Sequence, residues 1–162
     1  MNAVIDTSPL PNRHAIRTLI EGLVGRDVDL KDCDPLPVKT TNVIAVYVTD
    51  KLTVAALVAV DLEGAARLGG ALGMLPRGGV DDLIAERDLT GMVRDNVYEV
   101  LNVLAAVFNV ENAPHVRLYE VYGPNGSVPA DVMSLSQAIG SRMDIKATIA
   151  GYGDARVSII TR

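Results

Sequence analysis

The chain has 162 residues, a length that suits one domain with a buried core. Its formal net charge is −5 and its 15 basic residues are scattered, which argues against a nucleic-acid partner because phosphate contacts need clustered Lys and Arg. Cys33 is the only cysteine, so an intrachain disulfide is excluded, and with only two histidines, His14 and His115, metal or Ser-His chemistry has little support.

The start of the chain predicts a helix behind a short tail. Asn12 can cap a helix whose apolar residues recur at helical spacing as far as Gly25, which is suited to end it. We therefore expect residues 1–11 to form a tail and residues 12–162 a single domain. The first ten residues have no basic region before an apolar run, and no apolar segment of about 18 residues is free of charge. The sequence thus predicts neither a signal peptide nor membrane insertion, and it favours the cytoplasm.

The rest of the chain predicts strands on either side of a helical middle. In chain order, we expect a turn-rich loop over residues 27–37, strands over 38–41, 43–49 and 52–60, and a helix over 62–72. A break over residues 76–79 separates it from helices over 81–87 and 88–110, the second of which starts at Asp88 or Thr90. Strands over 116–122, 143–150 and 155–161 complete the chain. A tight turn at Asp50 and Lys51 joins two of the strands, and Asp61 can cap the helix over 62–72, which its glycines weaken. This order predicts an α+β fold with a largely antiparallel sheet backed by the long helix.

The long helix predicted over residues 88–110 is apolar almost all the way round, but it has one polar seam. At about 100° per residue, the seam consists of Asp95, Glu99, Asn102, Ala106 and Asn109. Carboxylate and amide groups on so apolar a helix cost free energy unless they meet water or a partner. We therefore expect the seam to face outward or into a shallow groove. Packing against loop backbone or against a second copy of the chain would explain the same spacing.

Two residues of this seam form a pair with a chemical use. Glu99 and Asn102 are three positions apart and project side by side from one helix face. A carboxylate can hold an ammonium or guanidinium group of a partner, whereas an amide both donates and accepts hydrogen bonds, as the orienting of an attacking water requires. Neither group is a strong nucleophile, so the pair points to hydrolysis by a positioned water.

The run over residues 95–106 resembles a known signature. Its Asp95, Glu99 and Asn102 match the Asp/Ser-x-x-x-Glu-x-x-Asn pattern of the CheC and CheX phosphatases of bacterial chemotaxis, and the order of elements over residues 12–162 is similar to that family. Only one copy of the motif is present, because residues 21–24 read Glu-Gly-Leu-Val with valine in place of asparagine. The resemblance is therefore to the single-site CheX type.

This resemblance implies a function, a partner and an assembly. It implies dephosphorylation of a phosphoaspartyl response regulator of the CheY kind, in which Glu99 pairs with a lysine of the regulator, Asn102 orients the water and Asp95 is a supporting residue. The regulator brings the phosphoryl group and its Mg²⁺, so the chain is expected to need no cofactor or metal ligands of its own. It also implies a homodimer, for which unpaired strand edges are available.

A second hypothesis is a non-catalytic docking module, similar to the flagellar switch components that use the same fold. The single motif and the residues after it support this hypothesis, because Ala105 and Ala106 stand where CheX-like sequences often have glycine. The two hypotheses differ in whether a bound phosphorylated receiver domain loses its phosphoryl group faster than it does alone.

Overall fold

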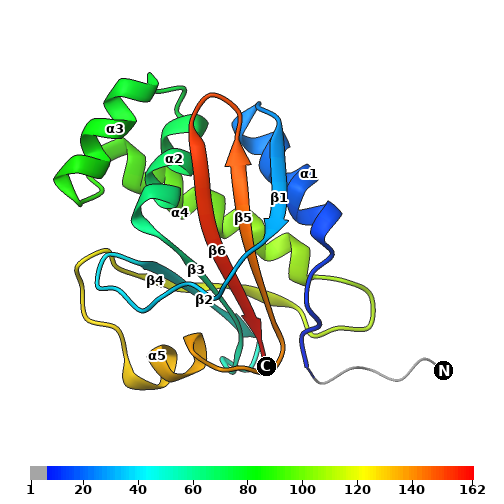
Figure 1. Cartoon of the computed structure of the whole chain (residues 1–162). Coiled ribbons are helices and arrows are strands. Elements are labelled where there is room, and N and C mark those ends of the chain that lie inside the picture. The colour runs from blue at the N-terminus through cyan, green and yellow to red at the C-terminus, as the bar shows by residue number, and fades with distance from the viewer. Residues whose placement is uncertain (1–6) are drawn as a thin grey trace.

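One antiparallel sheet of six strands carries the fold in the computed structural model, which describes residues 7–162 (Figure 1). The strands are β1 (Val28–Asp32), β2 (Val43–Thr49), β3 (Val54–Val60), β4 (Val116–Tyr122), β5 (Arg142–Ile149) and β6 (Gly153–Thr161). They lie in the order β1-β5-β6-β3-β2-β4, and every neighbouring pair is antiparallel. The predicted α+β class with an antiparallel sheet is confirmed, and β1 and β4 are the two edge strands.

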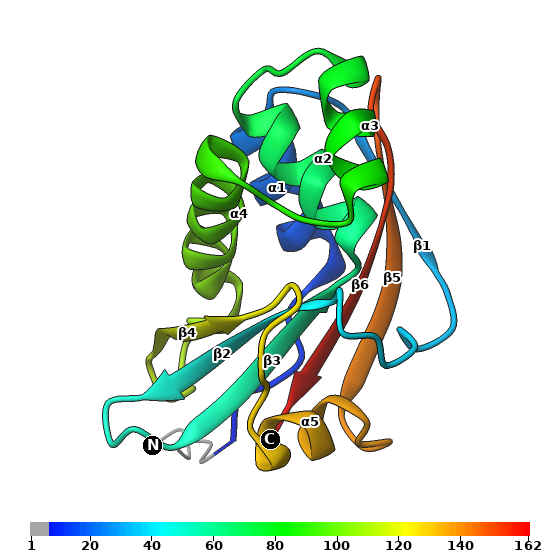
Figure 2. The same ribbon diagram turned by 90° about the vertical axis from the view of Figure 1, so that its left-hand side faces the viewer.

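Helices cover both faces of this sheet, but unequally. They are α1 (Arg13–Val24), α2 (Leu62–Leu72), α3 (Arg77–Glu86), α4 (Gly91–Leu104), the short 3₁₀ helix η1 (Ala105–Phe108) and α5 (Ala130–Ser136). Figure 2 shows α1, α2 and α4 on one side of the sheet and α5 on the other. The long helix α4 therefore backs the sheet, as predicted.

Strand β2 has apolar side chains on both faces because each face meets a helical layer. Its alternate residues Val43, Ala45 and Tyr47 belong to the larger core with α1, α2 and α4. The residues between them, such as Ile44 and Val46, belong to a smaller core with Val132 of α5. A strand buried on both faces reads as a continuous apolar run, and β2 is buried over its first six residues. The sequence had predicted this strand from its richness in valine, threonine and isoleucine.

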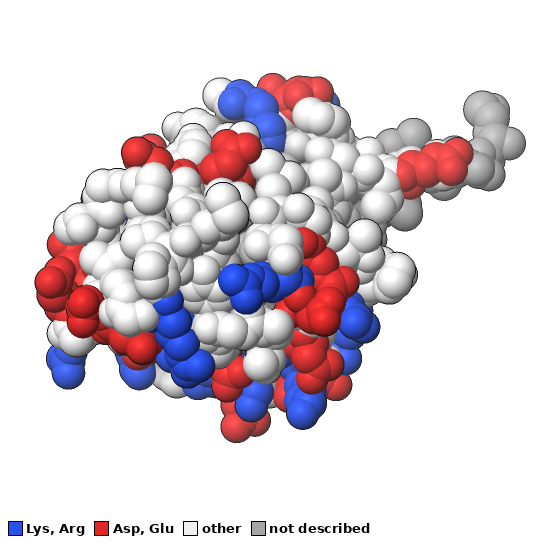
Figure 3. Space-filling model, turned by 90° about the horizontal axis from the view of Figure 1, so that it is seen from above, with Lys and Arg blue, Asp and Glu red and all other residues white. Residues whose placement is uncertain are grey.

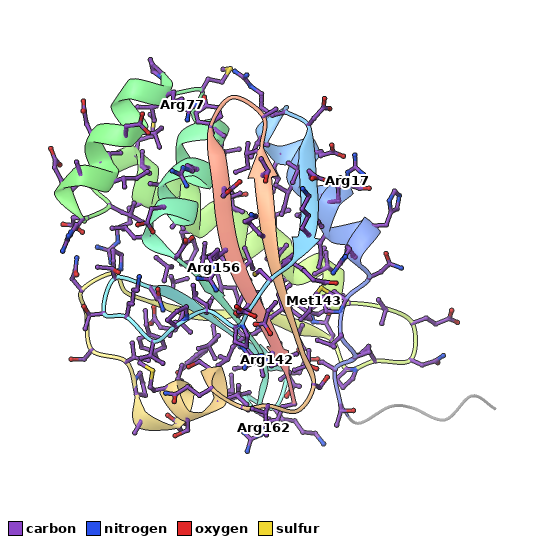
Figure 4. The ribbon with its side chains drawn as sticks, in the orientation of Figure 1. Arg17, Arg77, Arg142, Met143, Arg156 and Arg162 are labelled. Carbon is purple, nitrogen blue, oxygen red and sulfur yellow. The ribbon has the colours of Figure 1, made fainter. Side chains whose placement is uncertain are left out.

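The outer face of β5 and β6 is polar instead, and it anchors two loops. The guanidinium of Arg142 donates to both carboxylate oxygens of Asp144, at 2.9 and 2.8 Å, and the Ser158 hydroxyl donates to the same carboxylate at 2.6 Å. Figure 4 shows Arg142 on β5 and Arg156 on the neighbouring β6. Arg156 donates to the carbonyl of Asp34 at 2.9 Å, and the N–H of Leu36 donates to Ser158 at 3.1 Å. These bonds hold the segment after β1 against the sheet.

Replacing Asp144 with asparagine should lower the free energy of unfolding by about 3 kcal/mol at pH 7, because it leaves the mostly buried Arg142 without its carboxylate. Burial raises the pKa of Asp144, but the hydrogen bonds from Arg142 and Ser158 and the charges of Arg142 and Arg156 outweigh it, so this pKa lies below its ordinary value. A lowered pKa in the folded state gives stability that is present above the unfolded pKa of about 4 and is lost as the pH falls through the folded pKa.

Urea denaturation from pH 7 down to pH 2 measures this effect. The parent should lose stability over that acid range more steeply than Asp144→Asn. Asp29→Asn is the control, because Asp29 pairs with Lys31 on the exposed surface at 3.9 Å and such pairs contribute less than about 1 kcal/mol. An Asp144→Asn variant as stable as the parent at pH 7 would show that the ion pair between Arg142 and Asp144 does not stabilise the fold.

Several predicted boundaries were wrong. Strand β1 lies inside the predicted loop over residues 27–37: Val28 faces the core while Asp29 and Lys31 face outward, and this alternation marks an edge strand rather than a turn. The predicted strand over residues 38–41 is a turn, closed by a hydrogen bond from the Asn42 N–H to the carbonyl of Lys39.

The helices also differ in their limits. Helix α3 begins at Arg77, inside the break predicted over residues 76–79, and α5 was not predicted. The helix predicted as far as residue 110 ends earlier, at Leu104, while Thr90, one of its two predicted starts, is the N-cap of α4. The predicted tail, residues 1–11, lies partly outside the described residues, and within the described part Ser8 and Pro11 are buried.

Charges of both signs are mixed over the surface seen from above. On this face, a broad uncharged area occupies the centre, and acidic and basic side chains lie interspersed around it (Figure 3). This face therefore has no broad area of one sign of charge.

Candidate functional site

The polar seam of α4 lies at the surface of the domain. Asp95, Glu99 and Asn102 are all exposed. The opposite side of the helix, made of Val93, Val97, Val100, Leu101 and Leu104, is buried. Residues 95 and 99 are four apart and both acidic, a pairing that destabilises a helix by a few tenths of a kcal/mol. The structure brings the three side chains to one accessible face, and their chemical roles stay predictions.

Strand β2 fixes the turn of α4 that carries Asn102. The hydroxyl of Tyr47, which is fully buried, donates to the carbonyl of Leu101 at 2.6 Å. In a regular α-helix this carbonyl would accept the N–H of Ala105, but here that N–H donates to the carbonyl of Asn102 and the chain tightens into η1. Burial raises the pKa of Tyr47, which keeps its hydroxyl protonated as a donor. Sequence reasoning missed Tyr47, although it is the one phenol in an apolar strand.

Replacing Tyr47 with phenylalanine should lower the free energy of unfolding by about 1–2 kcal/mol, because the buried carbonyl of Leu101 loses its partner. The substitution should also lower any activity that depends on Asn102, because Asn102 directly follows Leu101. Tyr152→Phe is a matched control: the Tyr152 hydroxyl donates to the carbonyl of Leu75 at 2.7 Å, far along the chain from the seam. Urea denaturation and the turnover rate measure the two effects. Equal activity of both variants would show that Tyr47 only stabilises the fold.

Glycines of α2 let α4 approach closely. A Cβ on Gly69 would stand 2.6 Å from the carbonyl oxygen of Val93 and 2.8 Å from a methyl group of Val97, both on α4. The side-chain amide of Asn96 donates to the carbonyl of Gly69 at 3.0 Å, a bond that this close approach makes possible. The interpretation of these glycines as a weakness of the helix was therefore incomplete, because Gly69 is a packing contact between α2 and α4.

Asn109 does not belong to the same surface group as Asn102. It follows η1, and its side-chain amide donates to the carbonyl of Val116 at 3.0 Å while its oxygen accepts the Val116 N–H at 2.8 Å. Both hydrogen-bonding functions of this amide are used to hold the start of β4. Its helical spacing suggested a place in the seam, but its role is structural.

Two further properties can be stated for residues 7–162. In this part of the chain, no three His, Cys, Asp or Glu side chains come together as a group that could hold a metal ion. None of its helices combines the length and the apolar character needed to cross a lipid bilayer.

Comparison with known proteins gives structural matches only. No protein family model matches the sequence, and no curated protein matches it. Among solved structures, the FliM middle domain from H. pylori matches with a TM-score of 0.62 at 6% identity, over 91% of this chain and 83% of that chain. A chain of the FliG-FliM complex from H. pylori matches with a TM-score of 0.51 at 7% identity, over 91% of this chain and 85% of that chain.

A CheX structure matches over nearly its whole length. It is the crystal structure of the CheX-CheY-BeF3-Mg²⁺ complex from Borrelia burgdorferi, with a TM-score of 0.56 at 15% identity, over 91% of this chain and 93% of that chain. The predicted resemblance in fold is confirmed by these matches, which at such low identity speak for the fold alone. The chain therefore has the α+β fold that CheX and the FliM middle domain share.

Proposed function

We propose that this protein hydrolyses the aspartyl phosphate of a CheY-like receiver domain. The observation that carries the proposal is the exposed line of Asp95, Glu99 and Asn102 on a helix otherwise buried against the sheet. In the reaction a water attacks phosphorus, the bond from phosphorus to the aspartyl oxygen breaks, and inorganic phosphate and the free carboxylate of the receiver are the products.

Each residue of the seam has one task in this proposal. Asn102 holds the attacking water in line with the bond that breaks, using its amide as donor and acceptor. Glu99 pairs with a lysine of the receiver, and Asp95 supports the acidic surface that meets it. The receiver carries the Mg²⁺ that offsets the charge of its phosphoryl group, so this chain supplies no cofactor. The reaction belongs to chemotaxis-type signalling in the cytoplasm, with no membrane insertion and no nucleic-acid partner.

The fold supports the proposal through one of the solved structures that this chain resembles. The CheX structure that this chain resembles is a complex with CheY, BeF3 and Mg²⁺. The assay that tests the proposal is phosphate release from a receiver domain phosphorylated with a small phosphodonor. Hydrolysis faster than the receiver's own decay is the expected result, and a decay rate unchanged by the protein would overturn the proposal.

A second candidate function is docking without catalysis. The structural match to the FliM middle domain, with a TM-score of 0.62, is higher than the match to the CheX complex, with 0.56. Loss of glycine after the motif, at Ala105 and Ala106, agrees with this alternative. A receiver domain that binds tightly and still decays at its own rate would decide for the docking module.

We also propose that the protein is a homodimer, paired through an edge of its sheet. The edge strands β1 and β4 each have one side without a strand partner among residues 7–162, and Tyr119 of β4 is 55% exposed. Light scattering coupled to size exclusion should give twice the chain mass. A monomer at high protein concentration would contradict this proposal.

A further inference from the structure

A pocket of about 230 Å³ lies beside the seam, between α4 and β4. Figure 2 shows α4 close to β4, which is an edge strand of the sheet. The lining of the pocket includes Val43, Leu89, Arg94, Val97, Tyr98 and Glu120. The turn at Gly123 closes one side. At about 100° per residue, Tyr98 lies about 40° round the helix from Asn102, so the pocket lies on a flank of the seam.

The floor and one wall of the pocket are fixed by the fold. Val43, Leu89 and Val97 are almost completely buried and give an apolar floor. The wall at Gly123 packs so closely that a Cβ there would overlap the carbonyl oxygen of Asn42. Asn125 holds the same turn, because its N–H donates to the carbonyl of Thr40 at 2.7 Å and its amide to the carbonyl of Arg87 at 3.0 Å. The pocket is therefore preformed.

The rim of the pocket is charged and has spare bonding capacity. Among residues 7–162, neither Arg94 nor Glu120 belongs to an ion pair. Tyr98 is 48% exposed, although other residues of its helix, α4, are buried in the core. An apolar floor below an unpaired guanidinium and an unpaired carboxylate suits an apolar side chain that has an acidic neighbour for Arg94 and a hydrogen-bond donor for Glu120.

The size of the pocket selects the kind of occupant. Pockets that hold drug-sized ligands measure about 300–1,000 Å³, and this one is smaller. A single large apolar or aromatic side chain fits such a space, and side chains of this kind dominate the affinity of protein interfaces. Together with its place on the flank of the seam, this size favours one side chain of a docked protein as the occupant.

We propose that this pocket is an anchor site for the receiver domain, which inserts one apolar or aromatic side chain between α4 and β4 and places an acidic residue against Arg94. The choice of the receiver as occupant rests on the proposed function. A stable interface buries about 800 Å² on each partner, so a receiver that contacts Glu99 and Asn102 also covers Tyr98 and the pocket mouth. The pocket then sets which receiver binds, while the seam acts on its phosphoryl group.

The test compares binding and hydrolysis in the full chain. The probes are the receiver domains encoded in the same genome, each held in its active form with BeF3 and Mg²⁺ for binding and phosphorylated for hydrolysis. Arg94→Glu and Tyr98→Ala alter the rim at exposed positions, so the fold should persist. Arg77→Glu on α3 and Ile139→Ala after α5 are exposed controls with a similar change away from the pocket.

Both rim variants should raise the Kd of the bound receiver about tenfold or more, with kcat at saturating receiver unchanged, while both controls should match the parent. If the rim variants bind and hydrolyse the receiver as the parent does, the anchor site is overturned and the phosphatase proposal stays intact. The parent could also bind a receiver without hydrolysing its phosphoryl group. If the rim variants then bind that receiver more weakly, the anchor site is supported and the phosphatase proposal is overturned. Absence of binding to every receiver would overturn both.

Discussion

Replacing Asn102 with alanine should reduce phosphate release from a phosphorylated receiver by about a hundredfold or more at saturating receiver. The amide is the group that orients the attacking water, and removal of one positioning donor from an active site costs on that order. The fold should lose little, because Asn102 is exposed and surface substitutions change stability by about 0.5 kcal/mol or less. Circular dichroism and urea denaturation check the fold, and single-turnover phosphate release checks the rate.

Asn109→Ala is the matched control on the same stretch of chain. That substitution removes both hydrogen bonds to Val116 and should lower stability by about 1–3 kcal/mol. The folded fraction should keep the hydrolysis rate of the parent. A folded Asn102→Ala variant with full activity would show that α4 is not the catalytic element. That result would overturn the phosphatase proposal.

Replacing Glu99 with alanine should weaken capture of the phosphorylated receiver far more than it slows the bound complex. Removal of a carboxylate that pairs with a lysine at a desolvated interface costs about 2–5 kcal/mol, because the lysine is left without its partner. This cost corresponds to a loss in kcat/KM of about thirtyfold or more. The main change should be in KM, since Glu99 holds the partner rather than the water. Initial rates over a range of receiver concentrations separate KM from kcat.

Glu86→Ala on α3 gives the control for removal of an exposed glutamate, and it should leave KM unchanged. Restoring the acid as Glu99→Asp should recover part of the affinity, because the charge is kept at a shorter reach. A fall in kcat with KM unchanged would assign Glu99 to the chemical step instead of to capture.

Local signals in the sequence were sufficient for much of the fold. The helix capped by Asn12, the helix capped by Asp61 and the β2-β3 hairpin were predicted because capping side chains and apolar periodicity act within a few residues. Strand β1 was missed because its outward-facing Asp29 and Lys31 resemble loop composition. Only its pairing with β5, far along the chain, makes that segment a strand.

The candidate site divides in the same way. Helical spacing alone placed Asp95, Glu99 and Asn102 on one face, because α4 is regular over those residues. The same spacing was misleading at Asn109, where the chain has already left the helix. Where the helix ends, the carbonyl of Leu101 accepts a hydrogen bond from Tyr47 on another element, and no local pattern around residue 101 carries that information.

The close contact at Gly69 has a consequence for how loss of function would be distributed in a mutational survey. Any side chain at Gly69 would press against Val93 and Val97 and displace α4 from behind, moving its outer face without touching it. A screen for inactive variants should therefore mark two separate regions, the seam and the inner side of α2. Only the first region would coincide with residues that a bound partner protects from solvent, so inactivity by itself is a poor map of the partner's footprint on this protein.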